Sequence, residues 1–137
     1  MIYLASPWFD DEAEAFCKEV EEFIISTGND AYFPRRHQFE SAQETFDSNV
    51  SNIVNCDVLV ALVFRKDVGT AWEIGMAYAI DKHIILVGKD DSTFKSKTNL
   101  MLAKCGTAMT FENFRKYLLN EKSFNVVSFD KNWEGIE

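Results

Sequence analysis

Two carboxylates, Asp67 and Glu73, lie six residues apart directly after the most apolar run of the chain, with Gly69 between them. This order predicts a strand end, a tight turn at Gly69 and a helix start. Glu73 then falls in the first helical turn, where the positive end of the helix dipole favours an ionised carboxylate. An ionised Glu73 can attack a carbon while Asp67 holds or delivers a proton. Carboxylates with such divided roles cleave a bond at an anomeric carbon with retention.

The same stretch also has a purely structural interpretation. Thr70 and Glu73 fit a capping box, in which Thr70 caps the helix and Glu73 reaches back to the Thr70 amide. Asp67 fits a turn or cap position equally well. The helix expected at 70–80 is apolar nearly all round, which predicts that it is well buried. Both interpretations stay open at this point.

A second set of side chains accompanies the first apolar segment, residues 1–5. If this segment is a strand beside the most apolar strand, Tyr3 brings its hydroxyl to Glu73, and Trp8 and Phe9 form a flat apolar wall for a ring. The alternative is that Trp8 and Phe9 are core residues, as large aromatic side chains usually are.

Strand and helix patterns alternate along the chain. Strands are expected at 1–5, 30–33, 56–64, 83–88 and 107–109, and helices at 10–27, 40–55, 70–80, 99–104 and 111–119. This alternation predicts an α/β fold, a doubly wound, flavodoxin-like or Rossmann-like parallel sheet of four to five strands with helices on both faces. The run 56–64 is expected to be the central strand. Residues 89–98 are expected to form a mobile surface loop and residues 124–137 a packed arm.

Residues 1–137 are expected to form one domain with one core. The formal net charge of -8 opposes nucleic acid as a partner, because binding would require many phosphates to be neutralised. The three cysteines and two histidines have no metal-ligand or disulfide spacing, so we expect reduced thiols, no metal and no cofactor. The basic run at 35–37 is expected to be solvated surface. Without an apolar span or a signal peptide pattern, a cytoplasmic protein with no membrane contact is expected.

Four motifs occur along the chain in one order. They are Ile2-Tyr-Leu-Ala-Ser-Pro-Trp-Phe9, Asp57 at the head of an apolar strand, Asp67-x-Gly-x-x-x-Glu73-x-Gly75-x-Ala77, and Thr98-Asn-Leu-Met101. Taken together, over nearly the whole chain, they resemble the nucleoside 2-deoxyribosyltransferase family. The Asp, Gly and Glu-x-Gly-x-Ala signature after a hydrophobic strand is fairly specific, and the Asn-Leu-Met element points toward the transferases of this family.

The resemblance implies catalytic roles for three residues. Glu73 matches the nucleophile, which attacks C1′ of a 2′-deoxynucleoside and forms a deoxyribosyl-enzyme ester. Asp67 matches the residue that hydrogen-bonds the base and helps to protonate it, and Tyr3 matches the tyrosine that orients the nucleophile. Splitting one displacement into two through a covalent ester is ordinary nucleophilic catalysis.

The expected substrate-binding residues are Trp8, Phe9, Gln38, Asn49, Gly69, Asn99 and Met101. The resemblance implies that Trp8, Phe9 and Gln38 stack on or recognise the base. It also implies that a neighbouring subunit supplies Asn99 and Met101, hence a homo-oligomer with shared active sites. Asn49 stands where related sequences often carry an aspartate, so the base contacts depart from the family there.

The implied activity is retaining transfer of 2-deoxyribose between nucleobases, with 2′-deoxynucleosides and free bases as the small-molecule partners. The closest alternative is a 2′-deoxynucleoside 5′-monophosphate N-hydrolase, which needs serine or basic groups for a phosphate, and only Ser6 suggests one. A third possibility is a non-catalytic nucleotide-binding module in which Glu73 merely caps its helix. The acidic charge balance and the Asn-Leu-Met element favour the transferase.

Overall fold

The computed structural model describes residues 1–95 and 100–120. Its strands are β1 (Ile2–Ala5), β2 (Ala31–Tyr32), β3 (Val58–Leu62), β4 (His83–Gly88) and β5 (Thr107–Thr110). They form one 5-stranded parallel sheet in the order β2-β1-β3-β4-β5. This is the flavodoxin-like order of doubly wound sheets, so the predicted fold class is confirmed, with β3 in the centre.

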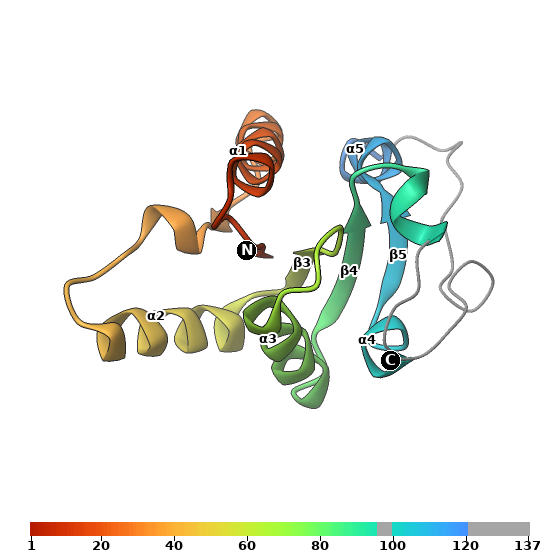
Figure 1. The fold of residues 1–137 in the computed structure, drawn as a ribbon. Helices are drawn as coiled ribbons and strands as arrows, with labels where there is room; N and C mark the ends of the chain where they lie inside the picture. Colours follow the sequence, from red (N-terminus) through yellow and green to blue (C-terminus); the bar gives the residue numbers. More distant parts are fainter. Residues whose placement is uncertain (96–99, 121–137) are drawn as a thin grey trace.

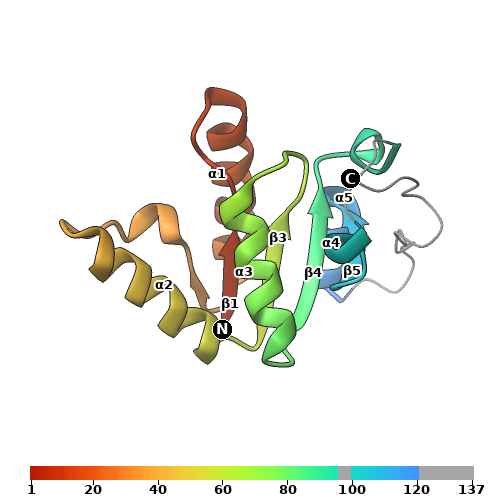
Figure 2. The ribbon, with the colours of Figure 1, turned by 60° about the horizontal axis from the view of Figure 1, so that its bottom comes forward.

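The helices cover both faces of this sheet. They are α1 (Asp11–Ser26), α2 (Ala42–Asn55), α3 (Val68–Ala79), α4 (Leu100–Ala103) and α5 (Phe111–Leu118), with the 3₁₀ helices η1 (Pro34–Arg36) and η2 (Asp91–Lys95). In Figure 1, α1 and α5 lie on one side of the sheet, and α2, α3 and α4 lie on the other. Figure 2 looks onto α3, which lies over β1, β3 and β4.

The core has two layers because successive side chains of a strand point to opposite faces of the sheet. In β1, Tyr3 belongs to the cluster on the α3 side and Leu4 to the cluster on the α1 side. In β3, Leu59 and Val60 divide in the same way. This alternation is what places the Tyr3 hydroxyl on the side of α3.

The first and last helices described begin where the sequence predicts. Asp10 Oδ1 accepts a hydrogen bond from the Ala13 amide at 2.9 Å, which caps α1. At the other end, Gly28 follows with a φ of 76°, a conformation that suits glycine. Thr110 caps α5 through a hydrogen bond from the Asn113 amide at 3.2 Å.

The prediction that α3 is well buried is wrong. Its buried residues are Thr70, Ile74 and Ala77. Trp72 and Tyr78 on the same helix are 50% and 60% exposed. A helix on the outside of a sheet buries one stripe against it, so the apolar residues of the outer stripe stay at the surface. Trp72 packs instead against Phe46 of α2, with 5.7 Å between the ring centroids.

The segment expected as a mobile loop at 89–98 is in part a 3₁₀ helix, η2, in which Phe94 is buried. Gly88 makes room for this ring, because a Cβ at Gly88 would lie 2.7 Å from Phe94 Cζ. The buried ring of Phe94 thus holds η2 against the sheet, although the segment as a whole is polar. Residues 96–98 of that expectation, and the arm expected at 124–137, lie outside the described residues.

Cys17 and Cys56 are free and buried, and Cys105 is free and partly exposed. Within residues 1–95 and 100–120, no group of histidine, cysteine and acidic side chains is arranged to hold a metal ion. In the same part of the chain, no helix combines the length and apolar character needed to cross a membrane.

Candidate active site

The first turn of α3 is organised by Asp67, which is its N-cap. Asp67 Oδ2 accepts hydrogen bonds from the amide and from the hydroxyl of Thr70, each at 2.8 Å. The prediction that Thr70 caps the helix is therefore wrong. The helix begins at Val68, and the Asp67 side chain accepts from the amide of Thr70, the third residue of the helix. The helix starts earlier than expected, so Glu73 falls in its second turn and takes no part in a capping box.

Gly69 lies inside the first turn of α3, and the prediction of a tight turn there is also wrong. Among the described glycines, only Gly28 has a positive φ. A Cβ at Gly69 would lie 3.5 Å from Asp67 Oδ2, an ordinary van der Waals contact. Because glycine has no side chain, Gly69 leaves the start of α3 beside Asp67 uncovered.

Tyr3 reaches α3 because β1 lies directly beside β3, with Tyr3 and Leu59 in register. Its side chain is fully buried under the helix. The Tyr3 hydroxyl donates a hydrogen bond to Glu73 Oε2. The contact expected from the adjacency of the two strands is therefore present in the structure.

Glu73 is poised between its two protonation states. Burial raises its pKa, the Tyr3 hydrogen bond lowers it and the charge of Asp67 raises it again, so that the pKa moves from 4.5 to about 7. Glu73 lies in the second turn of α3, so the helix dipole that was expected to favour its ionised form acts on it less than on a residue of the first turn. Burial and the charge of Glu73 raise the pKa of Tyr3 far above its usual value, so Tyr3 stays protonated and donates.

Trp8 and Phe9 follow β1 and contact each other, with 4.5 Å between the ring centroids. Trp8 is half-buried and packs against the cluster on the α1 side of the sheet. Phe9 is 75% exposed. The two aromatic residues thus divide between the two interpretations: Trp8 is in part a core residue, whereas Phe9 presents its ring to the solvent.

The other expected substrate-binding residues are spread more widely. Gln38 is exposed and donates from Nε2 to the Arg35 carbonyl at 3.3 Å. Asn49 lies on α2, where its Oδ1 accepts a hydrogen bond from the Tyr32 hydroxyl at 3.5 Å. Met101 is 77% exposed on α4. Asn99 lies outside the described residues.

Sequence reasoning missed a buried carboxylate, Glu21 of α1, which has 0% exposure. Arg35 donates to it from Nε at 3.0 Å and from Nη2 at 2.6 Å, and Arg36 donates from Nε at 2.8 Å. The prediction that the basic run at 35–37 is merely solvated surface is therefore wrong. A signal was present, because Glu21 stands on the apolar stripe of its helix between Cys17 and Ile24.

Sequence reasoning also missed Tyr32 of β2. Its ring stacks on Tyr3 with 5.7 Å between the centroids and an angle of 20° between the planes. The Tyr32 hydroxyl lies 2.8 Å from Ser48 Oγ. The only sequence signal was an aromatic residue in a strand next to the one that carries Tyr3.

Two segments far apart in the chain, β1 with Tyr3 and the start of α3 with Asp67 and Glu73, thus meet at this site. A partly buried carboxylate with a pKa near neutrality and one oxygen held by a donor has the properties of an activated nucleophile. The second carboxylate acts on it through space, as its contribution to the pKa of Glu73 shows. The arrangement is suited to displacement at carbon with a proton partner close by.

The chain is similar to several solved structures. The 2-deoxyribosyltransferase of Bacillus psychrosaccharolyticus is 26% identical, with a TM-score of 0.71 over 90% of this chain and 91% of that chain. A 2-deoxyribosyltransferase from Leishmania mexicana is 24% identical (TM-score 0.54, 74% and 75% covered), and a CMP N-glycosidase from Clostridium botulinum is 18% identical (TM-score 0.61, 87% and 96% covered). These last two show a shared fold. A search of curated protein sequences found no match.

The family model described as nucleoside 2-deoxyribosyltransferase matches residues 2–119. This match spans the whole sheet and includes Tyr3, Asp67 and Glu73, which the structure brings together. The chain therefore belongs to the nucleoside 2-deoxyribosyltransferase family.

Proposed function

We propose that the protein transfers 2-deoxyribose between nucleobases by two successive displacements at C1′, with Glu73 as the nucleophile. The observation that carries the proposal is the hydrogen bond from Tyr3 to a Glu73 carboxylate whose pKa is raised to about 7. Family membership and the similarity to the Bacillus psychrosaccharolyticus transferase support this class of substrate.

In the first step, Glu73 Oε1 attacks C1′ of a 2′-deoxynucleoside. The C1′–N bond breaks, its electron pair leaves with the base, and the base takes up a proton that comes from solvent through Asp67. Tyr3 holds Oε2 and so fixes the plane of the carboxylate. Thr70 occupies Oδ2 of Asp67, which leaves Oδ1 to face the base and its proton. Gly69 leaves room for the substrate beside Asp67.

In the second step, a ring nitrogen of another base attacks C1′ of the ester. The bond between C1′ and Glu73 breaks, its electron pair returns to the carboxylate, and the proton lost by the incoming base goes to Asp67 or to solvent. Two inversions give net retention. A carboxylate with a pKa near 7 is more nucleophilic than an ordinary one and still departs readily from the ester.

Recognition of the base is assigned to residues around this centre. The exposed ring of Phe9, backed by Trp8, is suited to stack on a base. Asn49 lies one aromatic ring away from Tyr3, through its contact with Tyr32, and Asn49 and Gln38 carry amides that can hydrogen-bond a base edge.

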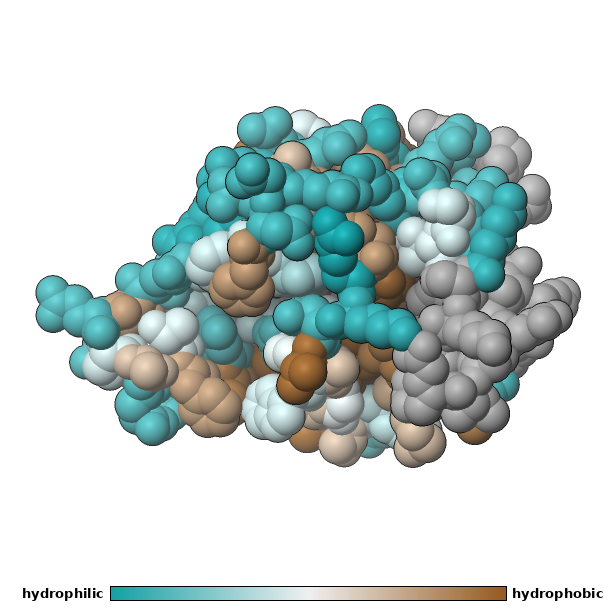
Figure 3. Space-filling view, in the orientation of Figure 1, coloured by the Kyte–Doolittle hydropathy of each residue, from teal (hydrophilic) through white to brown (hydrophobic). Residues whose placement is uncertain are grey.

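A second copy of the chain completes the site in this proposal, through Asn99 and Met101. The supporting observation is an apolar surface over α2 and α3, where Phe46 and Trp72 pack together although each remains about half exposed. Figure 3 shows apolar side chains in brown along this part of the molecule. Exposed apolar patches of this kind mark interaction sites. Light scattering is expected to give at least a dimer, and an active monomer would contradict the shared site.

The proposal is tested by incubating the protein with 2′-deoxyinosine and adenine and separating the products by chromatography. Deoxyadenosine is expected, and it should disappear in Glu73→Gln but persist in Glu22→Gln, a control at an exposed glutamate. Inosine should not serve as donor, because its 2′-hydroxyl lies beside the nucleophile. Hypoxanthine without a new nucleoside would indicate hydrolysis, and no turnover would indicate a binding module.

The same assay with dCMP addresses the hydrolase alternative. A 5′-phosphate needs cations, yet Arg35 and Arg36 of the basic run both donate to the buried Glu21. Because both arginines already pair with Glu21, the structure favours nucleosides over nucleotides as substrates. Faster release of cytosine from dCMP than from deoxycytidine would reverse that preference.

A further inference from the structure

We propose that Tyr32 is a positioning residue, which holds the Tyr3 ring in the orientation from which Tyr3 donates to Glu73. The catalytic consequence of this inference rests on the proposed function. The geometric part concerns the hydrogen bond alone and stands apart from any activity.

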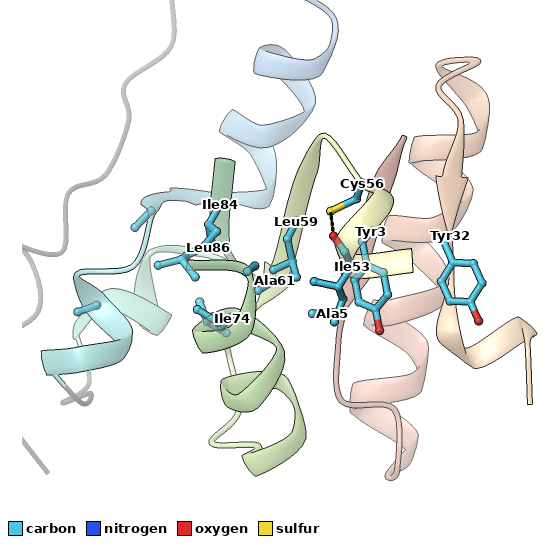
Figure 4. Close-up of a cluster of buried hydrophobic side chains, with 14 of the residues drawn as sticks. Tyr3, Ala5, Tyr32, Ile53, Cys56, Leu59, Ala61, Ile74, Ile84 and Leu86 are labelled. Carbon is cyan, nitrogen blue, oxygen red and sulfur yellow. Dashed lines mark hydrogen bonds between the residues drawn. The ribbon is translucent and has the colours of Figure 1, made fainter. Parts of the chain in front are cut away.

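The contact between the two tyrosines is built into the sheet. β2 is only 2 residues long, and the register places Tyr32 directly beside Tyr3. Their rings are stacked, with 5.7 Å between the centroids and 20° between the planes. Figure 4 shows the two rings side by side, one from β1 and one from β2. Cross-strand aromatic pairs restrict each other because both rings lie on the same face of the sheet.

Tyr32 is itself held from two further directions. The imidazole of His37, which follows η1, stacks on the Tyr32 ring with 4.7 Å between the centroids and 13° between the planes. The Tyr32 hydroxyl is tied to α2 through Ser48 at 2.8 Å and Asn49 at 3.5 Å. The rings of His37, Tyr32 and Tyr3 therefore form one continuous stack that ends at Glu73.

The outer end of the stack is also anchored. His37 directly follows Arg35 and Arg36, and both of these donate to the fully buried Glu21 of α1. Charge-assisted hydrogen bonds to a buried carboxylate leave that turn little freedom. Glu21 thus fixes the place from which His37 packs against Tyr32.

The neighbours of Tyr3 explain why the stack is needed. The remaining buried residues of its cluster are aliphatic side chains and one thiol, such as Ala5, Ile53 and Cys56. Such neighbours fill volume without selecting the plane of a ring, whereas a stacked ring selects it. Because one hydroxyl must meet one carboxylate oxygen, a small rotation of Tyr3 breaks its bond to Glu73.

The groups that govern the titration of Glu73 are few. Tyr3 faces it from β1 and Asp67 from the start of α3. Tyr3 in turn faces Tyr32 from β2 and Cys56, which precedes β3, and His37 stacks on Tyr32. The Tyr3 hydrogen bond is what lowers the pKa of Glu73, so losing it without loss of burial raises that pKa further.

Two variants separate orientation from mere packing. Tyr32→Phe keeps the ring and removes its hydroxyl, whereas Tyr32→Leu keeps apolar volume and removes the stacked plane. The titration midpoint of Glu73 is measured by ¹³C NMR of labelled glutamate, with Glu73→Gln to assign the signal. The pH dependence of kcat/KM is measured beside it. Tyr32→Phe keeps the stacked ring and loses only the tie to α2, so it is expected to shift the midpoint less than Tyr32→Leu. Tyr32→Leu is expected to raise the midpoint by about half to one pH unit and to cut kcat about tenfold with little change in KM.

His37→Ala is a third variant, at an exposed position. It loosens the stack from outside, so a smaller rise of the same midpoint is expected. An unchanged midpoint in His37→Ala, or an unchanged or lowered one in folded Tyr32→Leu, overturns the inference. If the wild type transfers no sugar but the midpoint still rises in Tyr32→Leu, the positioning stands and the proposed function fails.

Discussion

Two glutamates are withdrawn from water in this protein, and their protonation is set in opposite directions. Burial by itself raises the pKa of Glu21, but hydrogen bonds from Arg35 and Arg36 outweigh it, so that pKa is lowered. Glu73 instead faces a tyrosine hydroxyl and the carboxylate of Asp67, and its pKa rises to about 7. The charge of the partner, rather than the depth of burial, distinguishes the pKa of Glu21 from that of Glu73.

The two glutamates also lie on opposite faces of the sheet, and the helices cover these faces to different extents. On the α1 and α5 side, Phe16, Phe23 and Phe111 pack edge to face in a closed core. On the α2 and α3 side, aromatic rings of the helices remain half exposed. The first face is complete within one chain, whereas the second leaves surface for a substrate and, in the proposal above, a second copy.

Replacing the reactive carboxylate should have the largest effect. Glu73→Gln is expected to lower kcat at least about 1000-fold, because an amide does not attack C1′. Its free energy of unfolding at pH 8 should equal or exceed that of the wild type, which must keep a buried carboxylate ionised there. Initial rates of deoxyadenosine formation measure kcat, and urea unfolding measures the free energy of unfolding. Substantial transfer by the folded variant would remove Glu73 from the role of nucleophile.

Replacing the structural carboxylate should invert that pattern. Glu21→Gln is expected to lower the free energy of unfolding by about 3 kcal/mol, since it leaves the Arg35 guanidinium without its counter-ion. The neighbouring exposed Glu22 gives the control, because Glu22→Gln should change stability by less than about 0.5 kcal/mol. Activity per folded molecule should fall far less than in Glu73→Gln. If Glu21→Gln inactivates the protein without destabilising it, the division between the two glutamates is wrong.

The pH dependence of stability should separate the two residues by sign. The folded-state pKa of Glu73 lies above its ordinary 4.5, so its contribution is fully present below pH 4.5 and is lost as pH rises through about 7. The change amounts to roughly 3 kcal/mol. The folded-state pKa of Glu21 is lowered, so its contribution is present above 4.5 and lost as pH falls through that lowered value. Urea unfolding of wild type, Glu73→Gln and Glu21→Gln should show the Glu73 difference falling as pH rises from 4.5 to about 7 and the Glu21 difference falling as pH drops below 4.5; two differences that change in the same direction would contradict the comparison.

The smallest expected shift in pKa concerns the charge next to Glu73, although kcat itself should also fall in Asp67→Asn because Asp67 is the proton partner of the base in the proposal. Asp67→Asn keeps a good N-cap but removes the charge, so the pKa of Glu73 should fall by up to about one unit. The acid limb of kcat/KM should therefore move to lower pH. Thr70→Val removes one donor to Asp67 and keeps the charge, so its acid limb should stay in place. Equal shifts in both variants would show that the cap, not the charge, tunes Glu73.

The sheet could be predicted from the sequence because β3 and β4 are buried on both faces and therefore apolar throughout. The bond between Tyr3 and Glu73 followed from the same logic, since adjacent parallel strands bring their side chains together. The start of α3 could not be predicted, because Asp67 and Thr70 are both good caps and the choice depends on where β3 ends. Base-recognition residues on loops are placed by tertiary contacts that no local pattern encodes.

The pairing of Arg35 with Glu21 escaped prediction for a related reason. The two residues lie 14 positions apart, on elements that meet only after the chain has folded. An acidic residue on the apolar stripe of a helix indicates that a basic partner is buried with it, but it does not identify that partner. The stacking of Tyr32 on Tyr3 also escaped prediction, because it depends on the register between β1 and β2.

The bond between Tyr3 and Glu73 joins residues 70 positions apart, and it forms only when β1 has paired with β3 and α3 has packed over both. Such long-range parallel pairing is a late and slow event in folding. Until it occurs, Glu73 is an ordinary solvated side chain with an ordinary acidity. A partly folded molecule therefore lacks the raised pKa of Glu73, which arises only when α3 packs over β1 and β3.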